Sequence, residues 1–332
     1  MRGTGIYSDF DQETAWIRRE IIRDIESLPS SLRSRAKSYT IGRRRILEQG
    51  GVHAGPDGSL GTPVIYAAFW FSDALGLKNG RLRQLAGYSL VCTWVAATLR
   101  DDHMDSGPAK DTWKAKLAKF WFERYHESLR ELFPTEQGFQ HVVSSAEAEW
   151  RKYRKWQSNP TGSENPHPFS EDFLKESSRY YVACSLPPLV GIAHAAGRNR
   201  DAPRIERFLR MFSMGLRIVD DLMDWEEDLT AFQMNRSSVL IYVKNKMQPT
   251  GALDRIDVLS CLQSDELLND AYGAMIGYFR KAWRTAEAFG SPYLVSFMQD
   301  VMESQSKERE SLLTHATLAL SGLGQGLTKI LD

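Results

Sequence analysis

Apolar residues recur at intervals of three and four positions along almost the whole of this 332-residue chain. This spacing places apolar side chains on one face of an α-helix, whereas a half-buried strand would alternate apolar and polar residues. The pattern predicts helices over residues 11–27, 30–48, 62–76, 81–106, 109–131, 136–157, 169–196, 202–228, 236–246, 265–288 and 291–319. No stretch offers a convincing alternating series. We therefore expect an all-α fold, a bundle of about ten or more helices.

The chain offers one clear loop, at residues 158–168, where Pro, Gly, Ser and Asn are concentrated. Helices of similar length and polarity are predicted on both sides of it, so we interpret it as a surface loop rather than a linker between domains. The sequence therefore predicts a single domain over residues 1–332, with its core in 60–320 and additional N-terminal helices in 1–59.

The charge balance and the cysteines exclude several classes of protein. The 42 Lys and Arg residues balance 42 Asp and Glu residues, so no net field attracts nucleic acid or an anionic surface. Three scattered cysteines form neither a disulfide framework nor a zinc-ligand pattern. The N-terminus has no signal-peptide apolar region, and no run of about 18 uncharged apolar residues occurs. We expect a cytoplasmic protein with no nucleic-acid partner and no integral membrane association.

Two dense acidic clusters of the same design each follow an apolar stretch. They read Asp-Asp-His-Met-Asp at 101–105 and Asp-Asp-Leu-Met-Asp at 220–224. On a helix, positions three and four apart share a face, so carboxylates at this spacing crowd together. The carboxylates expected to crowd are Asp101, Asp102 and Asp105 in the first cluster, and Asp220, Asp224 and Asp228 in the second.

Crowded like charges need a compensating cation. At this spacing they destabilise a helix by roughly 0.2–0.5 kcal/mol per pair. Hard divalent cations, Mg²⁺ in particular, are usually held by a few carboxylates, waters and substrate phosphate oxygens. One acidic run by itself is more often a solvated helix face. Two runs of the same design at the ends of apolar helices favour a metal-binding function.

The chain resembles the class I isoprenoid synthase superfamily, which includes trans-prenyltransferases and class I terpene cyclases. The motif at 101–105 matches the first aspartate-rich motif of this superfamily, and the motif at 220–224 matches the second one of prenyltransferases. Asp220, Asp224 and Asp228 also occupy the three ligand positions of the cyclase motif, although Asp at all three departs from the usual pattern. The resemblance implies a helical bundle around a central apolar pocket.

The resemblance also implies a reaction and its ligands. Three Mg²⁺ ions, for which Mn²⁺ can substitute, would be bound by Asp101, Asp102, Asp105, Asp220, Asp224 and Asp228. They would bind the diphosphate of an allylic isoprenyl substrate, which ionises to a carbocation. The expected catalytic residues are Asp101, Asp105, Asp220 and Arg179. A homodimer is implied as well.

Cationic side chains are expected to bind the diphosphate together with the metal. The resemblance places such a residue before the second motif, at Lys175 or Arg179, and Arg236, which follows the second cluster by about two helical turns, is a similar candidate. We favour Arg179 because it directly precedes an apolar stretch. An ion pair on the helix surface, with Glu176, is the alternative role for Arg179.

Aromatic residues in the apolar helices are expected to line the pocket, where ring faces stabilise positive charge. The candidates are Trp94, Phe69, Tyr180 and Phe212, each of which could equally be an ordinary core residue. Pro187 and Pro188 lie within an apolar helical range. They predict a break in that helix, either as a source of free carbonyl groups near the cation or as a packing kink.

Chain-elongating prenyltransferases need a second diphosphate site for isopentenyl diphosphate. Residues 41–46 and 106–110 do not match the basic motifs that supply this site. We therefore favour a terpene synthase acting on one substrate, farnesyl or geranylgeranyl diphosphate or a modified form of either. The first alternative is a trans-isoprenyl diphosphate synthase, with Arg43, Arg44 and Arg45 as substitute ligands. The second is a non-catalytic helical scaffold.

Overall fold

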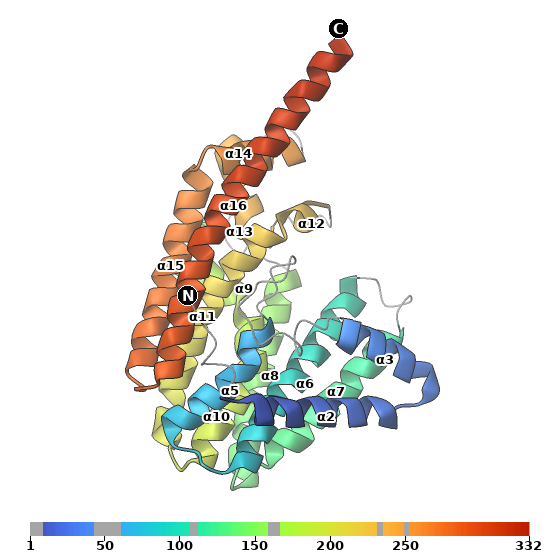
Figure 1. The fold of residues 1–332 in the computed structure, drawn as a ribbon, viewed down its shortest axis with the longest axis vertical. Coiled ribbons are helices and arrows are strands. Elements are labelled where there is room, and N and C mark those ends of the chain that lie inside the picture. Colours follow the sequence, from blue (N-terminus) through green and yellow to red (C-terminus); the bar gives the residue numbers. More distant parts are fainter. Residues whose placement is uncertain are drawn as a thin grey trace. The chain divides into compact units, whose positions relative to one another are not determined.

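The computed structural model describes residues 9–42, 61–105, 112–158, 167–230, 235–248 and 252–331. At 40–42, 61–64, 104–105 and 320–331 it describes the backbone alone. All regular structure in these ranges is helical (Figure 1), which confirms the all-α prediction. The helices are α2 (Asp11–Ser27), α3 (Ser30–Gly42), α5 (Gly61–Leu75), α6 (Gly80–Asp105), α7 (Thr112–Arg130), α8 (Glu136–Ser158), α9 (Glu171–Ser177), α10 (Arg179–Ala195), the 3₁₀ helix η1 (Asn199–Asp201), α11 (Ala202–Met223), α12 (Trp225–Thr230), α13 (Ser238–Met247), α14 (Arg255–Gln263), α15 (Glu266–Glu287) and α16 (Pro292–Leu331).

The predicted helix ranges differ from the structure in several places. The range 169–196 forms two helices, because the Ser178 N–H bonds to the carbonyl groups of Leu174 and Glu176 and ends α9 before α10 begins. The range 202–228 is interrupted at Asp224, between α11 and α12. Helix α14 was not predicted, although a capping box formed by Asp254 and Asp257 starts it.

The chain divides into two compact units, and the boundary between them falls within α8, α10, α11, α15 and α16. The first unit comprises Met1–Ala148, Tyr181–Leu209 and Thr285–Phe297; the second comprises Glu149–Tyr180, Arg210–Arg284 and Met298–Asp332. The single-domain organisation therefore stays a prediction. Of the helices described, none combines the length and the apolar composition that a membrane crossing requires.

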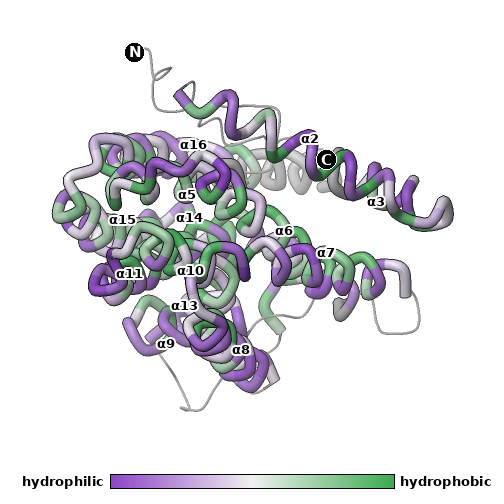
Figure 2. Tube along the Cα trace, turned by 90° about the horizontal axis from the view of Figure 1, so that it is seen from below, coloured by the Kyte–Doolittle hydropathy of each residue, from purple (hydrophilic) through white to green (hydrophobic). Residues whose placement is uncertain are grey.

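In the first unit, α6 packs against α2, α5 and α7. Its apolar stretch from Leu85 to Leu99 is buried apart from the half-buried Trp94 and Thr98, as its lack of charge predicts. Green, apolar stretches on α6 and α10 mark such buried segments in Figure 2. Polar pairs fix the packing: the Tyr88 hydroxyl of α6 donates to Asp24 of α2, and Ser89 of α6 bonds to Ser128 of α7 at 2.7 Å.

In the second unit, the last part of α11 lies against α15. Gly215 of α11 allows this approach, since a Cβ atom there would overlap the ring of Phe279. The ring of Phe212, one turn earlier, lies 5.7 Å from the same ring. This packing holds the C-terminal end of α11, and with it the second acidic cluster, against a rigid neighbour.

The close approach at Gly215 predicts the effect of adding one methyl group. Gly215→Ala should lower the free energy of unfolding by about 1–3 kcal/mol, because the Phe279 ring is fully buried and cannot move aside freely. Gly273→Ala on α15, where a Cβ would meet nothing within 4 Å, is the control. It should stabilise by up to about 1 kcal/mol through helix propensity. Urea unfolding measures both variants, and equal stabilities would contradict this packing.

Candidate functional site

The first acidic cluster lies at the C-terminal end of α6, in the first unit. Asp101 and Asp102 are both half-buried, whereas the side chain of Asp105 lies outside the described residues. The hydroxyl of Tyr39, on α3, donates to Oδ2 of Asp102 at 2.8 Å. Lys114, on α7, donates to the backbone oxygen of Asp102 at 3.4 Å. Two neighbouring helices therefore position this end of α6.

Helix α10 lies close enough to this cluster for Asp101 to act on it electrostatically. Burial of the Cys184 thiol raises its pKa to about 12; a hydrogen bond with Thr93 lowers this pKa, and the charge of Asp101 raises it further. Helix α10 continues through Pro187 and Pro188, so the expected interruption is absent, while the alternative, a packing kink, stays a prediction. Proline has no N–H, however, so the helix supplies no donor to the carbonyl groups four residues earlier, at Ala183 and Cys184.

The second cluster, in the second unit, keeps helical spacing across the interruption at Asp224. The Asp224 N–H bonds to the Asp220 carbonyl at 2.9 Å, and the Asp228 N–H bonds to the Asp224 carbonyl at 2.9 Å. Because both bonds join residues four positions apart, the three side chains start from one side of the backbone, as the sequence predicts. Asp220 is half exposed, so its carboxylate is accessible to a ligand.

The neighbouring Asp221 points away from this stripe into the protein. Its side chain is 1% exposed and accepts hydrogen bonds from the Ser238 N–H at 2.8 Å and the Ser238 hydroxyl at 2.5 Å. Arg217, one turn earlier on α11, pairs with it at 2.6 Å. The same guanidinium donates to the backbone oxygen of Arg236 at 3.1 Å. Arg217 and Asp221 thus attach the start of α13 to the end of α11.

The sequence reasoning missed Arg217. Its signal was its position four residues before Asp221 and three before Asp220, where a cation on a helix pairs with both. Nη1 of Arg217 lies 3.8 Å from Oδ2 of Asp220. Arg217 is therefore a fixed positive charge beside the carboxylate stripe.

One arginine does not neutralise the stripe. Burial and then the charges of Asp220, Asp228 and Glu227 raise the pKa of Asp224 to about 7, and Arg217 lowers it. Burial also raises the pKa of Asp228, against the effects of Arg217 and Ser237.

Carboxylates that repel one another in this way offer the hard oxygen donors that Mg²⁺ prefers, so the residues fit such an ion. Among the described residues, no three His, Cys, Asp or Glu side chains converge closely enough to hold a metal ion. The metal ligands stay a prediction.

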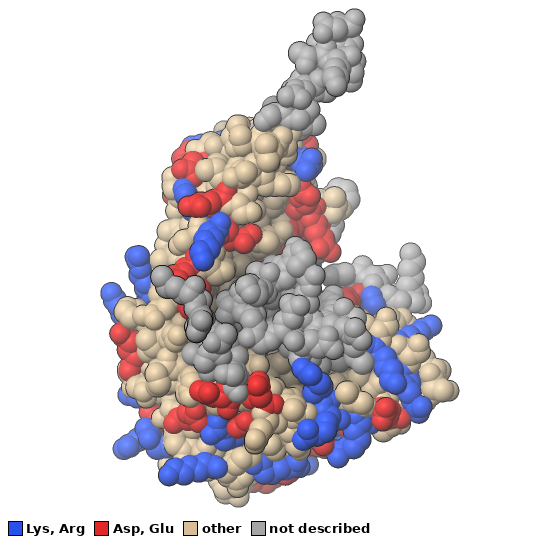
Figure 3. Space-filling model, in the orientation of Figure 1, with Lys and Arg blue, Asp and Glu red and all other residues tan. Residues whose placement is uncertain are grey.

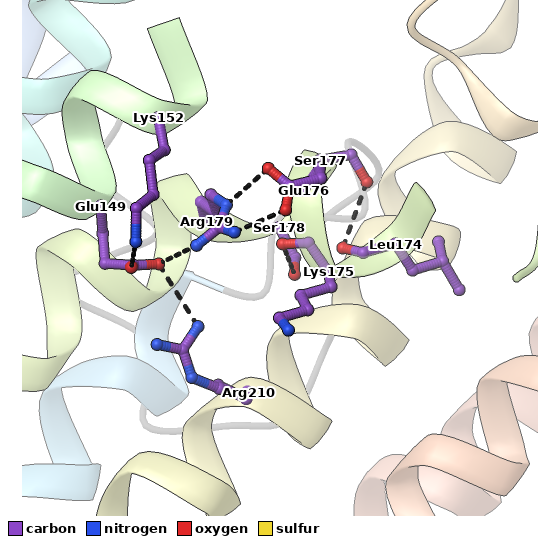
Figure 4. Close-up of polar contacts among 9 residues, drawn as sticks. All are labelled: Glu149, Lys152, Leu174, Lys175, Glu176, Ser177, Ser178, Arg179 and Arg210. Atoms are coloured by element: carbon purple, nitrogen blue, oxygen red, sulfur yellow. Dashed lines mark hydrogen bonds and ion pairs between the residues drawn. The ribbon is translucent and has the colours of Figure 1, made fainter. Parts of the chain in front are cut away.

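The diphosphate-binding candidates lie in three different surroundings. Arg179, the first residue of α10, is buried and pairs with Glu149 and Glu176 (Figure 4), so the ion pair with Glu176 that the sequence allowed is present. Lys175 is exposed, and Arg236 is half-buried. Their binding of diphosphate stays a prediction.

The four aromatic candidates divide between core and partly exposed positions. Phe69 has no accessible surface and stacks on Phe10 at 5.3 Å, as an ordinary core residue would, and its contact with a substrate stays a prediction. Phe212 is buried against Phe279. Tyr180 is half-buried beside Trp150 and Tyr153, and Trp94 is half-buried on α6. Trp94 and Tyr180 therefore keep surface that a substrate could contact.

The raised pKa of Asp224 predicts a pH-dependent gain in stability for Asp224→Asn. The folded protein holds the Asp224 proton more tightly than the unfolded chain does, so wild-type stability falls as the pH rises from about 4 to about 7. The variant lacks this titration. Its melting temperature should exceed that of the wild type by an amount that grows over this pH range, when measured with a chelator present.

Glu226→Gln is the matched control for that measurement. Glu226 lies on α12, two residues after Asp224, but its partner is Arg255, at 2.9 Å, rather than the carboxylate stripe. This variant should show no such gain. A difference in melting temperature between Asp224→Asn and the wild type that stays constant with pH would contradict the raised pKa of Asp224.

Comparisons with protein-family models and with curated proteins found no match to this chain. Solved structures do match. A geranylgeranyl pyrophosphate synthetase from the archaeon Geoglobus acetivorans aligns over 91% of this chain and 100% of its own, with a TM-score of 0.65 and 14% identity. A geranylgeranyl pyrophosphate synthase from Lactobacillus brevis aligns over 89% of this chain and 98% of its own, with a TM-score of 0.61 and 12% identity. The chain therefore has the all-α fold of these two enzymes.

Proposed function

We propose that this chain is a Mg²⁺-dependent class I terpene synthase. It would ionise an allylic isoprenyl diphosphate, farnesyl or geranylgeranyl, and cyclise the resulting carbocation with release of diphosphate. One observation carries the proposal: two carboxylate clusters of the same design end the buried helices α6 and α11, in a chain with the fold of geranylgeranyl pyrophosphate synthases. The proposal requires both clusters to face one apolar pocket.

Each group of residues has a defined task in this reaction. Asp101, Asp102 and Asp105 would hold metal at the first cluster, and Asp220, Asp224 and Asp228 at the second. Bound Mg²⁺ supplies Lewis acidity that stabilises the negative charge of the departing diphosphate. Arg217 contributes a fixed positive charge beside Asp220.

The remaining residues would act on the two products of ionisation. The diphosphate oxygens would be bound by Arg179, Lys175 and Arg236, whose positive charges stabilise the negative charge of this product. Because ion pairs already fix Arg179, its part of this stabilisation is preorganised. The rings of Trp94 and Tyr180 would stabilise positive charge on the hydrocarbon. The carbonyl groups of Ala183 and Cys184 supply further dipoles within the unit that contains Asp101.

A second candidate keeps the fold and the metal chemistry but elongates a chain. The two matching structures favour it, because both are named as geranylgeranyl pyrophosphate synthases. Elongation requires a second cation-lined site for isopentenyl diphosphate. Arg43, Arg44 and Arg45, the candidates for this site, lie outside the described residues.

Product analysis separates the two candidates. We expect the purified chain with Mg²⁺ to convert farnesyl or geranylgeranyl diphosphate to hydrocarbon or alcohol products without isopentenyl diphosphate. Gas chromatography with mass spectrometry identifies these products, and a coupled assay measures the released diphosphate. Longer prenyl diphosphates that form only when isopentenyl diphosphate is added would reverse the assignment in favour of elongation. A lack of any turnover would favour a non-catalytic scaffold.

Neutralising one carboxylate of each cluster tests the metal assignment. Asp101→Asn and Asp220→Asn should each lower turnover about 10²-fold or more, because each removes stabilisation of the departing diphosphate. Glu123→Gln, an exposed carboxylate on α7, should change turnover little. Circular dichroism should show unchanged helicity in all three variants. Wild-type turnover in either aspartate variant would remove that cluster from the mechanism.

A further inference from the structure

Arg179 lies in a compact charged cluster in the second unit, formed by Glu149, Lys152, Glu176, Arg179 and Arg210 (Figure 4). Nη1 of Arg179 donates to Glu149 at 2.5 Å, while Nε and Nη2 donate to the two carboxylate oxygens of Glu176. Every nitrogen of this guanidinium thus has a carboxylate partner. An additional anion can bind Arg179 well only if it replaces one of these two carboxylates.

Glu149 is the permanent partner of Arg179. Its side chain is 9% exposed and it accepts from Lys152 at 3.1 Å and Arg210 at 3.3 Å as well as from Arg179. Burial raises the pKa of Glu149, but the hydrogen bonds from Lys152 and Arg179 and the nearby charges outweigh it, so the pKa is lowered. Withdrawing this carboxylate would leave the buried guanidinium of Arg179 with only the partly exposed Glu176 as a carboxylate partner, which is costly.

Glu176 is held much more weakly. Its side chain is 38% exposed, so water can solvate the carboxylate when it leaves Arg179. It lies in the last turn of α9, where the helix dipole disfavours a negative charge. Among the described residues, no second cation pairs with it. Glu176 therefore depends on Arg179, whereas Arg179 has Glu149 in addition.

The charges of the cluster favour the exchange of Glu176 for another anion. Lys152, Arg179 and Arg210 are the cations of this cluster, and the withdrawal of Glu176 would remove one of the two negative charges that Arg179 pairs with. Glu176 presents two oxygens to Nε and Nη2 of Arg179, which is also the geometry in which a phosphate group binds arginine. A diphosphate can thus occupy the position of Glu176 without a change in the pairing of Arg179 with Glu149.

We propose that Glu176 is an exchangeable counter-ion of Arg179, which competes with the substrate diphosphate, and that Glu149 is the positioning residue that holds Arg179 during the exchange. This inference rests on the proposed function, because it takes Arg179 to be a diphosphate ligand. It adds two acidic residues to the site: Glu176 tunes the affinity for the leaving group, and Glu149 fixes the direction of the guanidinium.

Binding of inorganic diphosphate in the presence of Mg²⁺ tests the exchange, with isothermal titration calorimetry as the readout. Removing the competing charge should tighten binding, so Glu176→Gln should lower the Kd about two- to fivefold, as expected for a partly exposed ion pair. Glu149→Gln should raise the Kd, because it loosens Arg179. A purely structural role for Glu176 predicts a lower melting temperature and an unchanged Kd.

Two controls connect the effect to Arg179. Glu171→Gln removes an equal charge from the same helix, where Glu171 is exposed and lies 3.7 Å from Lys281, and should leave the Kd unchanged. In an Arg179→Gln background, no guanidinium remains for Glu176 and the diphosphate to compete for. Adding Glu176→Gln to this background should therefore no longer tighten the binding of diphosphate. Arg179→Met, which also removes the charge and keeps an unbranched side chain, serves if Arg179→Gln does not fold.

The outcomes separate this inference from the proposed function. An unchanged or raised Kd in Glu176→Gln, while the wild type binds diphosphate and turns over substrate, overturns the exchange and leaves the function standing. Equal tightening in Glu176→Gln and Glu171→Gln also overturns it, since general electrostatics would then explain the effect. If the wild type neither binds diphosphate nor turns over substrate, both proposals fail.

Discussion

The crowding of carboxylates at the ends of buried helices is the constraint on which this structure depends. Helix α6 carries its aspartates directly after an apolar, buried stretch, and α11 does the same at its own C-terminal end. The C-terminal end of a helix disfavours negative charge, and neighbouring carboxylates repel one another. In the second cluster, burial first and then the neighbouring carboxylates raise the pKa of Asp224. In the proposed function, a bound divalent cation would offset this cost.

Lys and Arg side chains are interspersed with Asp and Glu side chains over the surface visible in Figure 3. At the two clusters, neighbouring polar and cationic side chains hold the aspartates in place. Arg217 is shared between Asp220, Asp221 and the backbone of Arg236, and so fixes the direction of the stripe. Tyr39 and Lys114 contact Asp102 at the first cluster. In the proposed function, carboxylates positioned in this way would hold the metal ions that bind the diphosphate.

Helix periodicity predicts the fold class and most helices of this chain, because each helix buries one face and the apolar spacing records that face. It does not detect Ser178, where two helices meet within a continuous apolar pattern, or the interruption at Asp224. The paired aspartate motifs identify the second stripe correctly as residues on one side of the backbone, since the spacing alone determines this. Burial of Phe69 against Phe10 and the pairing of Arg179 with Glu149 arise between segments distant in the chain, so local patterns cannot predict them.

The central claim is that the two carboxylate clusters share metal ions around one diphosphate. A crystal of the protein grown with Mn²⁺ and inorganic diphosphate tests it most directly, because anomalous scattering locates each Mn²⁺ ion independently of the protein atoms. We expect Mn²⁺ ligated by the aspartates of α6 and by those at the end of α11, with oxygens of a single diphosphate bound to both groups of ions. Anomalous peaks absent from both clusters, or clusters that each bind metal with no diphosphate between them, would contradict the account.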